Sequence, residues 1–332
     1  MPAHPTLHAF NAAALALAAA LLPAASQAQV PAAPAAPAAP TSPAAPAATP
    51  PRVAPLLNFQ RVLDRPERPQ PQHKFAYGSA AQQFGELWLP PAERYGAGPH
   101  PVVLLVHGGC WMAELPGPEL LAWQAEALRQ QGMAVWSISY RRVGHEGGGY
   151  PGTFQDVARG ADHLRELAKQ HPLDLGRITA SGHSAGGHLA LWLAARPRVP
   201  TNSPLHSAQP LPVQRVVPVA GVGDLAWAAP FIGAVCSPEI AGRLVDEKTR
   251  GKDAWADTSP AALGPLDVPV TMVSGVYDPI VPPAHARRYH QAALNRGAPE
   301  VKLLNLDEAG HFELIAPWTP AGAATVQAIL GR

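Results

Sequence analysis

The segment from Arg177 to Ala190 reads RITASGHSAGGHLA, and it decides the fold. Residues 177–181 predict a short strand, and the helical pattern that follows begins at Ala185. Between them, GHSAG at 182–186 matches the Gly-x-Ser-x-Gly pattern of a strand–turn–helix in which the serine takes a strained backbone conformation. We therefore predict that Ser184 is a nucleophile at the carboxyl edge of a sheet. A glycine-rich turn with a capping serine is the alternative.

Around this turn, the chain alternates predicted strands and helices. Strands are predicted at 84–89, 101–106, 134–140, 177–181, 213–220, 270–274 and 301–306. Helices are predicted at 119–131, 153–170, 185–196, 284–296 and 319–330. Strands separated by helices of this length form βαβ units, so the fold class is α/β with a mostly parallel sheet. Residues 225–259 do not follow this alternation of strands and helices, which predicts a small cap-like insertion.

A second motif, HGGCW at 107–111, follows the apolar strand 101–106. Two glycines after a buried strand allow a turn whose backbone N–H groups point into a cleft. We predict that the N–H groups of Gly109, Cys110 and Ala185 form an oxyanion hole. His107 is predicted to hold the loop rather than to take part in catalysis. A plain tight turn is the alternative.

HGGCW at 107–111 and GHSAGGHLA at 182–190 together resemble the kynurenine formamidase and carboxylesterase branch of the α/β-hydrolase superfamily. Acetyl-xylan and feruloyl-type esterases are related to that branch. The resemblance runs from about Gln83 to Arg332. It implies an eight-stranded sheet, a Ser-Asp-His triad and no cofactor.

The chain order of the superfamily implies where the other two triad members lie. The acid follows a late strand, and Asp278 stands in the loop after 270–274. The histidine follows the last strand, and His311 stands after 301–306. The competing carboxylates are Asp224, Asp267 and Asp307. Asp267 precedes its strand and so lies at the wrong edge, whereas Asp307 follows the same strand as His311 and is the main rival.

Composition divides the chain into a head and a domain. No Asp, Glu, Lys or Arg occurs before Arg52. Residues 1–28 hold an apolar run that is too short to span a bilayer and a small-x-small cleavage pattern, which predicts a signal peptide and export to the periplasm or the medium. The alternative is a disordered Ala-rich tail. Residues 29–55 predict a Pro/Ala-rich disordered spacer, and 56–332 predict the α/β-hydrolase domain.

The charge balance, the apolar runs, and the cysteine and tryptophan residues indicate which molecules the protein can bind. Lys plus Arg total 25 and Asp plus Glu total 24, which argues against nucleic-acid binding. No second apolar run reaches transmembrane length, and no metal-binding motif occurs. The two cysteines, Cys110 and Cys236, form either one disulfide or two separate thiols. Trp111 and Trp227 are predicted to line a substrate pocket.

Three functions fit these observations. The one favoured is a serine hydrolase that cleaves small-molecule carboxylic esters with small or aromatic acyl groups, through an acyl-enzyme. An arylformamidase that hydrolyses N-formylkynurenine is the alternative, although predicted export argues against it. A hydrolase fold used only for binding is the third. The substrate itself and the oligomeric state stay open.

Overall fold

The computed structural model describes residues 55–332, and its strands form one mixed eight-stranded sheet. The predicted signal peptide, and the spacer up to residue 54, lie outside the described residues. The strand order is β1-β2-β4-β3-β5-β6-β7-β8. The β1/β2 and β2/β4 pairs are antiparallel and every other pair is parallel. The strands are β1 His73–Ala76, β2 Phe84–Trp88, β3 His100–Val106, β4 Ala134–Ile138, β5 Leu173–His183, β6 Arg215–Val219, β7 Val270–Gly275 and β8 Val301–Leu306.

The central strands form where most side chains are apolar, and β3 is apolar throughout residues 101–106. Residues 102–106 of β3 pair in parallel with 134–138 of β4 on one side and with 178–182 of β5 on the other. All of these positions in β3 and β4 are buried, as expected for strands covered on both faces. The predicted α/β class and the α/β-hydrolase fold are confirmed by this topology.

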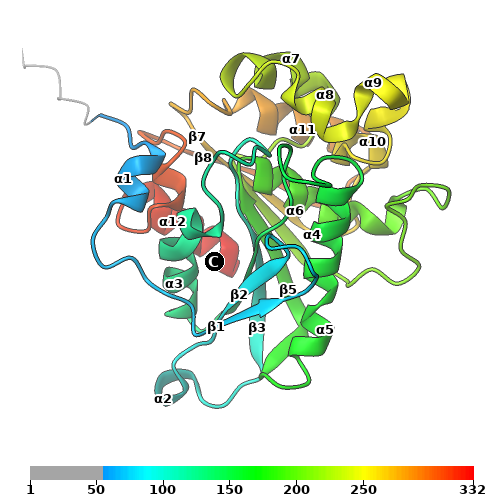
Figure 1. Cartoon of the computed structure of the whole chain (residues 1–332). Helices are drawn as coiled ribbons and strands as arrows, with labels where there is room; N and C mark the ends of the chain where they lie inside the picture. Colours follow the sequence, from blue (N-terminus) through cyan, green and yellow to red (C-terminus); the bar gives the residue numbers. More distant parts are fainter. Residues whose placement is uncertain (1–54) are drawn as a thin grey trace, which may run out of the picture. The chain divides into compact units, whose positions relative to one another are not determined.

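Helices cover both faces of the sheet. Figure 1 shows α3 (Ala122–Arg129) and α12 (Pro320–Leu330) together on one side, and α4 (Gly152–Asp162), α5 (Leu164–Leu167) and α6 (Ala185–Ala195) on the other. The remaining α-helices are α1 Phe59–Leu63, α2 Ala92–Tyr95, α7 Leu225–Val235, α8 Ile240–Val245, α9 Glu247–Arg250, α10 Pro260–Leu263 and α11 Ala284–Asn295. None of the helices within 55–332 combines the length and the apolar character that a membrane span requires.

Among the elements that differ from the sequence-based expectations are β1, the helix predicted at 153–170 and β5. β1 was not predicted, because as a largely exposed edge strand it lacks apolar alternation. The predicted helix 153–170 is divided into α4 and α5 at His163. β5 extends from Leu173 to His183 because a register shift in its pairing with β3 lets the chain bend and continue.

The segment 225–259 consists of short helices. α7, α8 and α9 are followed by the 3-10 helix η3 (Gly251–Trp255). Figure 1 shows them above the carboxyl ends of the parallel strands, where loops from several strands converge. This segment is therefore placed to shape the entrance of a cleft at that edge.

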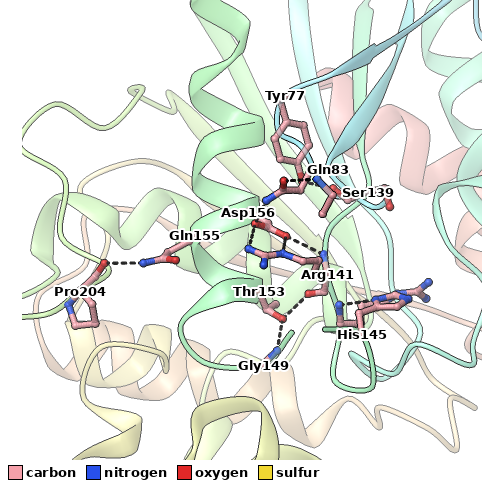
Figure 2. A network of polar contacts seen from close by, with 12 residues as sticks. Tyr77, Gln83, Ser139, Arg141, His145, Gly149, Thr153, Gln155, Asp156 and Pro204 are labelled. Carbon is pink, nitrogen blue, oxygen red and sulfur yellow. Dashed lines mark hydrogen bonds and ion pairs between the residues drawn. The ribbon is translucent and has the colours of Figure 1, made fainter. Parts of the chain in front are cut away.

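A buried carboxylate ties the loop after β4 to α4. Asp156 is buried and receives two hydrogen bonds from the Arg141 guanidinium, both 2.7 Å long. The backbone N–H of Arg141 and the side chain of Gln83 donate to the same carboxylate (Figure 2). Thr153 completes the contact by donating to the Arg141 carbonyl at 2.6 Å. The network fixes the chain as it leaves β4 towards the functional edge of the sheet.

Asp156→Ala is expected to lower the free energy of unfolding by about 3–5 kcal/mol, because removal of one partner leaves the Arg141 charge without compensation. Denaturant titration of the variant measures this loss. The matched control is Asp174→Ala, whose ion pair with Arg177 is largely exposed and should contribute less than about 1 kcal/mol. Equal losses in the two variants would contradict the role assigned to the buried pair.

Candidate active site

Ser184 stands at a strained turn between β5 and α6. Its φ of 57° and ψ of −120° lie outside the regions that most residues adopt. Two backbone hydrogen bonds hold it there: the Ser184 N–H donates to Val219 O at 2.8 Å, and the Ser184 carbonyl accepts from Gly187 N–H at 2.9 Å. The surrounding structure therefore maintains a backbone conformation that costs about 1–3 kcal/mol.

The glycines of the motif are required by close backbone packing. A Cβ at Gly182 would lie 2.3 Å from the Gly186 carbonyl oxygen. A Cβ at Gly186 would lie 2.0 Å from the Val106 carbonyl oxygen, on the neighbouring strand. Only residues without a side chain allow β3, the turn and α6 to approach so closely. The Gly-x-Ser-x-Gly spacing is thus a steric requirement of this turn.

The loop after β3 presents backbone donors beside Ser184. Gly109, Cys110 and Trp111 all have positive φ, at 96°, 48° and 55°. Within residues 55–332, the N–H groups of Gly109, Cys110 and Ala185 donate no hydrogen bond. Gly109 and Cys110 line the same cavity as Ser184. Unpaired N–H groups at such a place are suited to bind a negatively charged oxygen.

His107 and Arg142 hold this loop. Tyr140 Oη donates to His107 O at 2.8 Å, and the His107 and Tyr140 rings stack with centroids 4.5 Å apart. Burial lowers the pKa of His107 to about 3, with a smaller contribution from the charge of Arg142, so the ring is neutral at physiological pH. Arg142 Nη1 donates to the carbonyls of Leu115 at 2.6 Å and Pro116 at 3.0 Å. His107, which is buried, and Arg142 thus hold the loop in place.

Asp278 and His311 form a buried pair at the ends of β7 and β8. His311 Nδ1 lies 2.7 Å from Asp278 Oδ2, and the two residues are only 4% and 3% exposed. The other carboxylate oxygen, Oδ1, accepts from the N–H groups of Ile280 and Val281, both at 2.8 Å. Because a carboxylate only accepts hydrogen bonds, it holds the proton on Nδ1 and leaves Nε2 free to act as a base.

The three rival carboxylates have other positions. Asp224 caps α7 by accepting from Trp227 N–H at 3.2 Å, and it pairs with Arg288 at 3.1 Å. Asp267 pairs with Arg198 at 2.7 Å. Asp307 is exposed and makes no side-chain hydrogen bond within the described chain. Asp278 is therefore the carboxylate that orients His311.

Ser184 and His311 face one cavity of about 250 Å³. As far as residues 55–332 line it, the cavity has mostly apolar walls without Lys, Arg, Asp or Glu. These walls comprise Phe59, Gly109, Cys110, Leu115, Pro116, Leu120, His183, Ser184, Val235, Cys236, Ile280, His311 and Phe312. The Ser184 hydroxyl makes no hydrogen bond within residues 55–332, and such contacts often tighten only when substrate binds. No group of three metal-ligating side chains occurs in this part of the chain.

The two tryptophans predicted to line the pocket lie outside it. Trp111 is 2% exposed because its backbone turns the ring into the core, where it meets His188 edge-on at 5.4 Å. Trp227 is 46% exposed on α7 and packs against His285 at 5.2 Å. The cavity walls come instead from smaller apolar side chains and from two phenylalanines.

His183 is a supporting residue that sequence analysis missed. Its Nε2 donates to the backbone carbonyl of His311 at 3.0 Å, and the two rings are 4.3 Å apart. Burial, followed by the nearby His311, lowers the pKa of His183 well below its usual value. A neutral donor therefore holds the backbone of His311. Its position next to Ser184 in the motif was the available signal.

The two cysteines form a disulfide between Cys110 and Cys236, with Cα atoms 6.0 Å apart. Sequence alone left this pairing open. The bond joins the loop that carries the free N–H groups to the end of α7, and both cysteines line the cavity. The insertion and the loop after β3 are thus covalently linked across the site.

Reduction of this disulfide is expected to lower the free energy of unfolding by about 2–5 kcal/mol, because the bond closes a long loop in the unfolded chain. Thermal unfolding with and without a thiol reductant measures the effect. The matched control is the double variant Cys110→Ser/Cys236→Ser, whose melting temperature should not respond to reductant. An unchanged melting temperature of the reduced wild type would contradict this role.

The comparisons with known proteins place the chain in a family. Residues 86–293 match the profile of the BD-FAE family. Esterase LipQ of Mycobacterium tuberculosis is 28% identical over 272 residues, which cover 77% of this chain and 62% of LipQ, so the chain spans less than two thirds of that relative.

Two solved structures share the fold. Esterase B from Lactobacillus rhamnosis superposes with a TM-score of 0.67 at 21% identity, over 82% of this chain and 88% of that one. A truncated carbohydrate esterase from gut microbiota gives 0.63 at 19% identity, over 79% and 96% of the two chains. Because the family profile matches more than half of the sequence, and the sheet has the order expected of an α/β-hydrolase, this chain belongs to the BD-FAE family.

Proposed function

We propose that this protein is a serine carboxylic ester hydrolase acting on uncharged esters with small or aromatic acyl groups. The observation that carries the proposal is the His311–Asp278 hydrogen bond of 2.7 Å beside the cavity that Ser184 lines. A base oriented by a carboxylate next to a strained serine is the arrangement that activates a hydroxyl for acyl transfer.

The proposed reaction proceeds through an acyl-enzyme. Ser184 Oγ attacks the ester carbonyl while His311 Nε2 takes its proton, and Asp278 stabilises the imidazolium. The N–H groups of Gly109, Cys110 and Ala185 bind the oxyanion of the tetrahedral intermediate. His311 then gives the proton to the leaving alcohol. A water molecule, deprotonated by His311, hydrolyses the acyl-enzyme and releases the acid.

The walls of the cavity and the relatives both support the proposed substrate class. Burial of a charged group there would lack compensation, because no Lys, Arg, Asp or Glu of the described part of the chain lines the cavity. LipQ and Esterase B are named as esterases, and another structural neighbour is named as a carbohydrate esterase. An uncharged ester is the substrate that fits both lines of support.

We also propose export of the protein to an oxidising compartment. The apolar run and the cleavage pattern within 1–28 support this proposal. The Cys110–Cys236 disulfide supports it independently, because such bonds persist mainly outside the reducing cytosol. N-terminal sequencing of the protein recovered from the producing cells, with fractionation, tests it.

Hydrolysis of p-nitrophenyl acetate and butyrate, compared with N-formylkynurenine, tests the proposed activity. We expect higher kcat/KM for the esters, together with covalent labelling of Ser184 by a fluorophosphonate, located by mass spectrometry. A higher kcat/KM for N-formylkynurenine would instead support the alternative hypothesis of an arylformamidase. Absence of both hydrolysis and labelling would favour a hydrolase fold used for binding and would overturn the proposal.

A further inference from the structure

A short segment at the start of the described chain lies beside the active site. Residues 56–63 include α1, whose first turn is capped by Asn58 Oδ1 accepting from Arg61 N–H at 2.9 Å. The segment precedes residues 86–293, which match the family profile. Figure 1 shows α1 on the side of the sheet that carries α3 and α12.

Glu313 links this segment to the loop of His311. One oxygen of its carboxylate accepts from the N–H of Leu57, and the other accepts from the N–H of Gly310 at 3.0 Å. Glu313 is only 8% exposed, and its bond to Gly310 is buried while its bond to Leu57 is partly buried. Leu56 packs so closely that a Cβ at Gly310 would lie 3.0 Å from Leu56 Cδ1. The segment and the histidine loop are therefore held by one buried carboxylate.

The other end of α1 is anchored in the protein. Val62 is completely buried in the core. Beyond the helix, the Arg65 guanidinium lies 4.2 Å from the centre of the Trp318 ring and 5.2 Å from that of Trp123. These contacts belong to the cation–π class. A helix fixed at both ends presents its remaining side chains in defined positions.

The side chain presented to the cavity is Phe59. It lines the same cavity as Ser184 and His311. Its ring lies 6.2 Å from the Phe312 ring at an interplanar angle of 56°, and Phe312 in turn meets the His311 ring at 5.1 Å. Phe59 and Phe312 thus form an aromatic wall of the cavity, although they are far apart in the sequence.

We propose that Phe59 is a specificity-determining residue, which limits the length of the uncharged apolar group that flanks the scissile ester bond. The inference rests on the proposed ester hydrolysis. The apolar group belongs either to the acyl part or to the alcohol part of the ester, and in both cases burial against Phe59 is the interaction that selects it. In a cavity of about 250 Å³, loss of one phenyl ring opens space for several more methylenes.

Phe59→Ala in the full chain is the test, with two series of esters. The first varies the acyl group of p-nitrophenyl esters from acetate to octanoate, and the second varies the alcohol of alkyl acetates from methyl to octyl. One more buried methylene can change kcat/KM about fourfold. We therefore expect the ratio of kcat/KM for the longest ester to kcat/KM for the shortest ester to rise about tenfold or more in one series. Phe59→Trp should lower the same ratio, and the series that responds identifies the side of the ester.

Phe75→Ala is the matched control. Phe75 is half-buried in β1, where its ring contacts His171 at 5.5 Å, and it does not line the cavity. This variant should leave both ratios unchanged even if it unfolds at a lower temperature. Unchanged ratios in Phe59→Ala, with an active wild type, would overturn this inference alone. A wild type that is inactive on every ester would overturn the proposed function and, with it, the inference.

Discussion

Ser184→Ala is expected to lower kcat for ester hydrolysis by about 10⁶-fold, because this is the loss that accompanies removal of a serine nucleophile. In the proposed mechanism this hydroxyl forms the acyl-enzyme, and among residues 55–332 no other hydroxyl lines the cavity. The free N–H groups beside it cannot replace a nucleophile, although they should leave a small residual rate above that of water. Steady-state kinetics on p-nitrophenyl butyrate, with active-site titration of the wild type, measure the effect.

Ser181→Ala is the matched control for this variant. Ser181 lies three positions earlier in β5, is buried, and donates to the Val217 carbonyl at 2.7 Å. Its loss should cost about 1 kcal/mol of stability and leave kcat within a few-fold of wild type. Retention of wild-type turnover by Ser184→Ala would exclude this serine as the nucleophile. Equal losses in both variants would point to damage of the strand instead.

Asp278→Asn is expected to lower kcat by about 10⁴-fold while leaving the fold intact. The amide has nearly the shape of the carboxylate, but its NH₂ group can donate to Nδ1 and shift the imidazole proton to Nε2. In that tautomer, Nε2 no longer accepts the proton of Ser184. The negative charge that stabilises the imidazolium is lost as well. Kinetics at saturating ester concentration, with a circular-dichroism melt, separate this effect from unfolding.

Asp307→Asn is the control, because Asp307 was the strongest rival for the role of the acid. It is exposed on the loop after β8, so the substitution should change kcat less than twofold. A large loss in Asp307→Asn, together with a small one in Asp278→Asn, would reverse the assignment. The pair of variants therefore decides which carboxylate orients His311.

The sequence predicted the parts of the structure that depend on local patterns. The continuous apolar run at 101–106 located β3, and the glycine spacing around Ser184 located the turn, because both signals lie in neighbouring residues. Asp278 and His311 were located by chain order. Their hydrogen bond joins two loops that follow adjacent parallel strands of the sheet.

The remainder depends on contacts between residues far apart in the chain. Glu313 bonds to Leu57, and Cys110 bonds to Cys236 across 126 positions, so no local pattern could reveal either contact. Phe59 lies in a one-turn helix whose position depends on that carboxylate. Trp111 was predicted to line the pocket, whereas its backbone has a positive φ and its ring is buried in the core.

The Cys110–Cys236 disulfide, which joins two sides of the cavity, has a practical consequence for production of the protein. Protein produced in a glutathione-rich cytosol would carry two free thiols at the rim, open to alkylation and to mispairing between molecules. Preparations from such a host and from one with an oxidising compartment should therefore differ in shelf life and in sensitivity to iodoacetamide. Assay buffers that contain dithiothreitol would reduce the disulfide and so give protein with the properties of the cytosolic preparation.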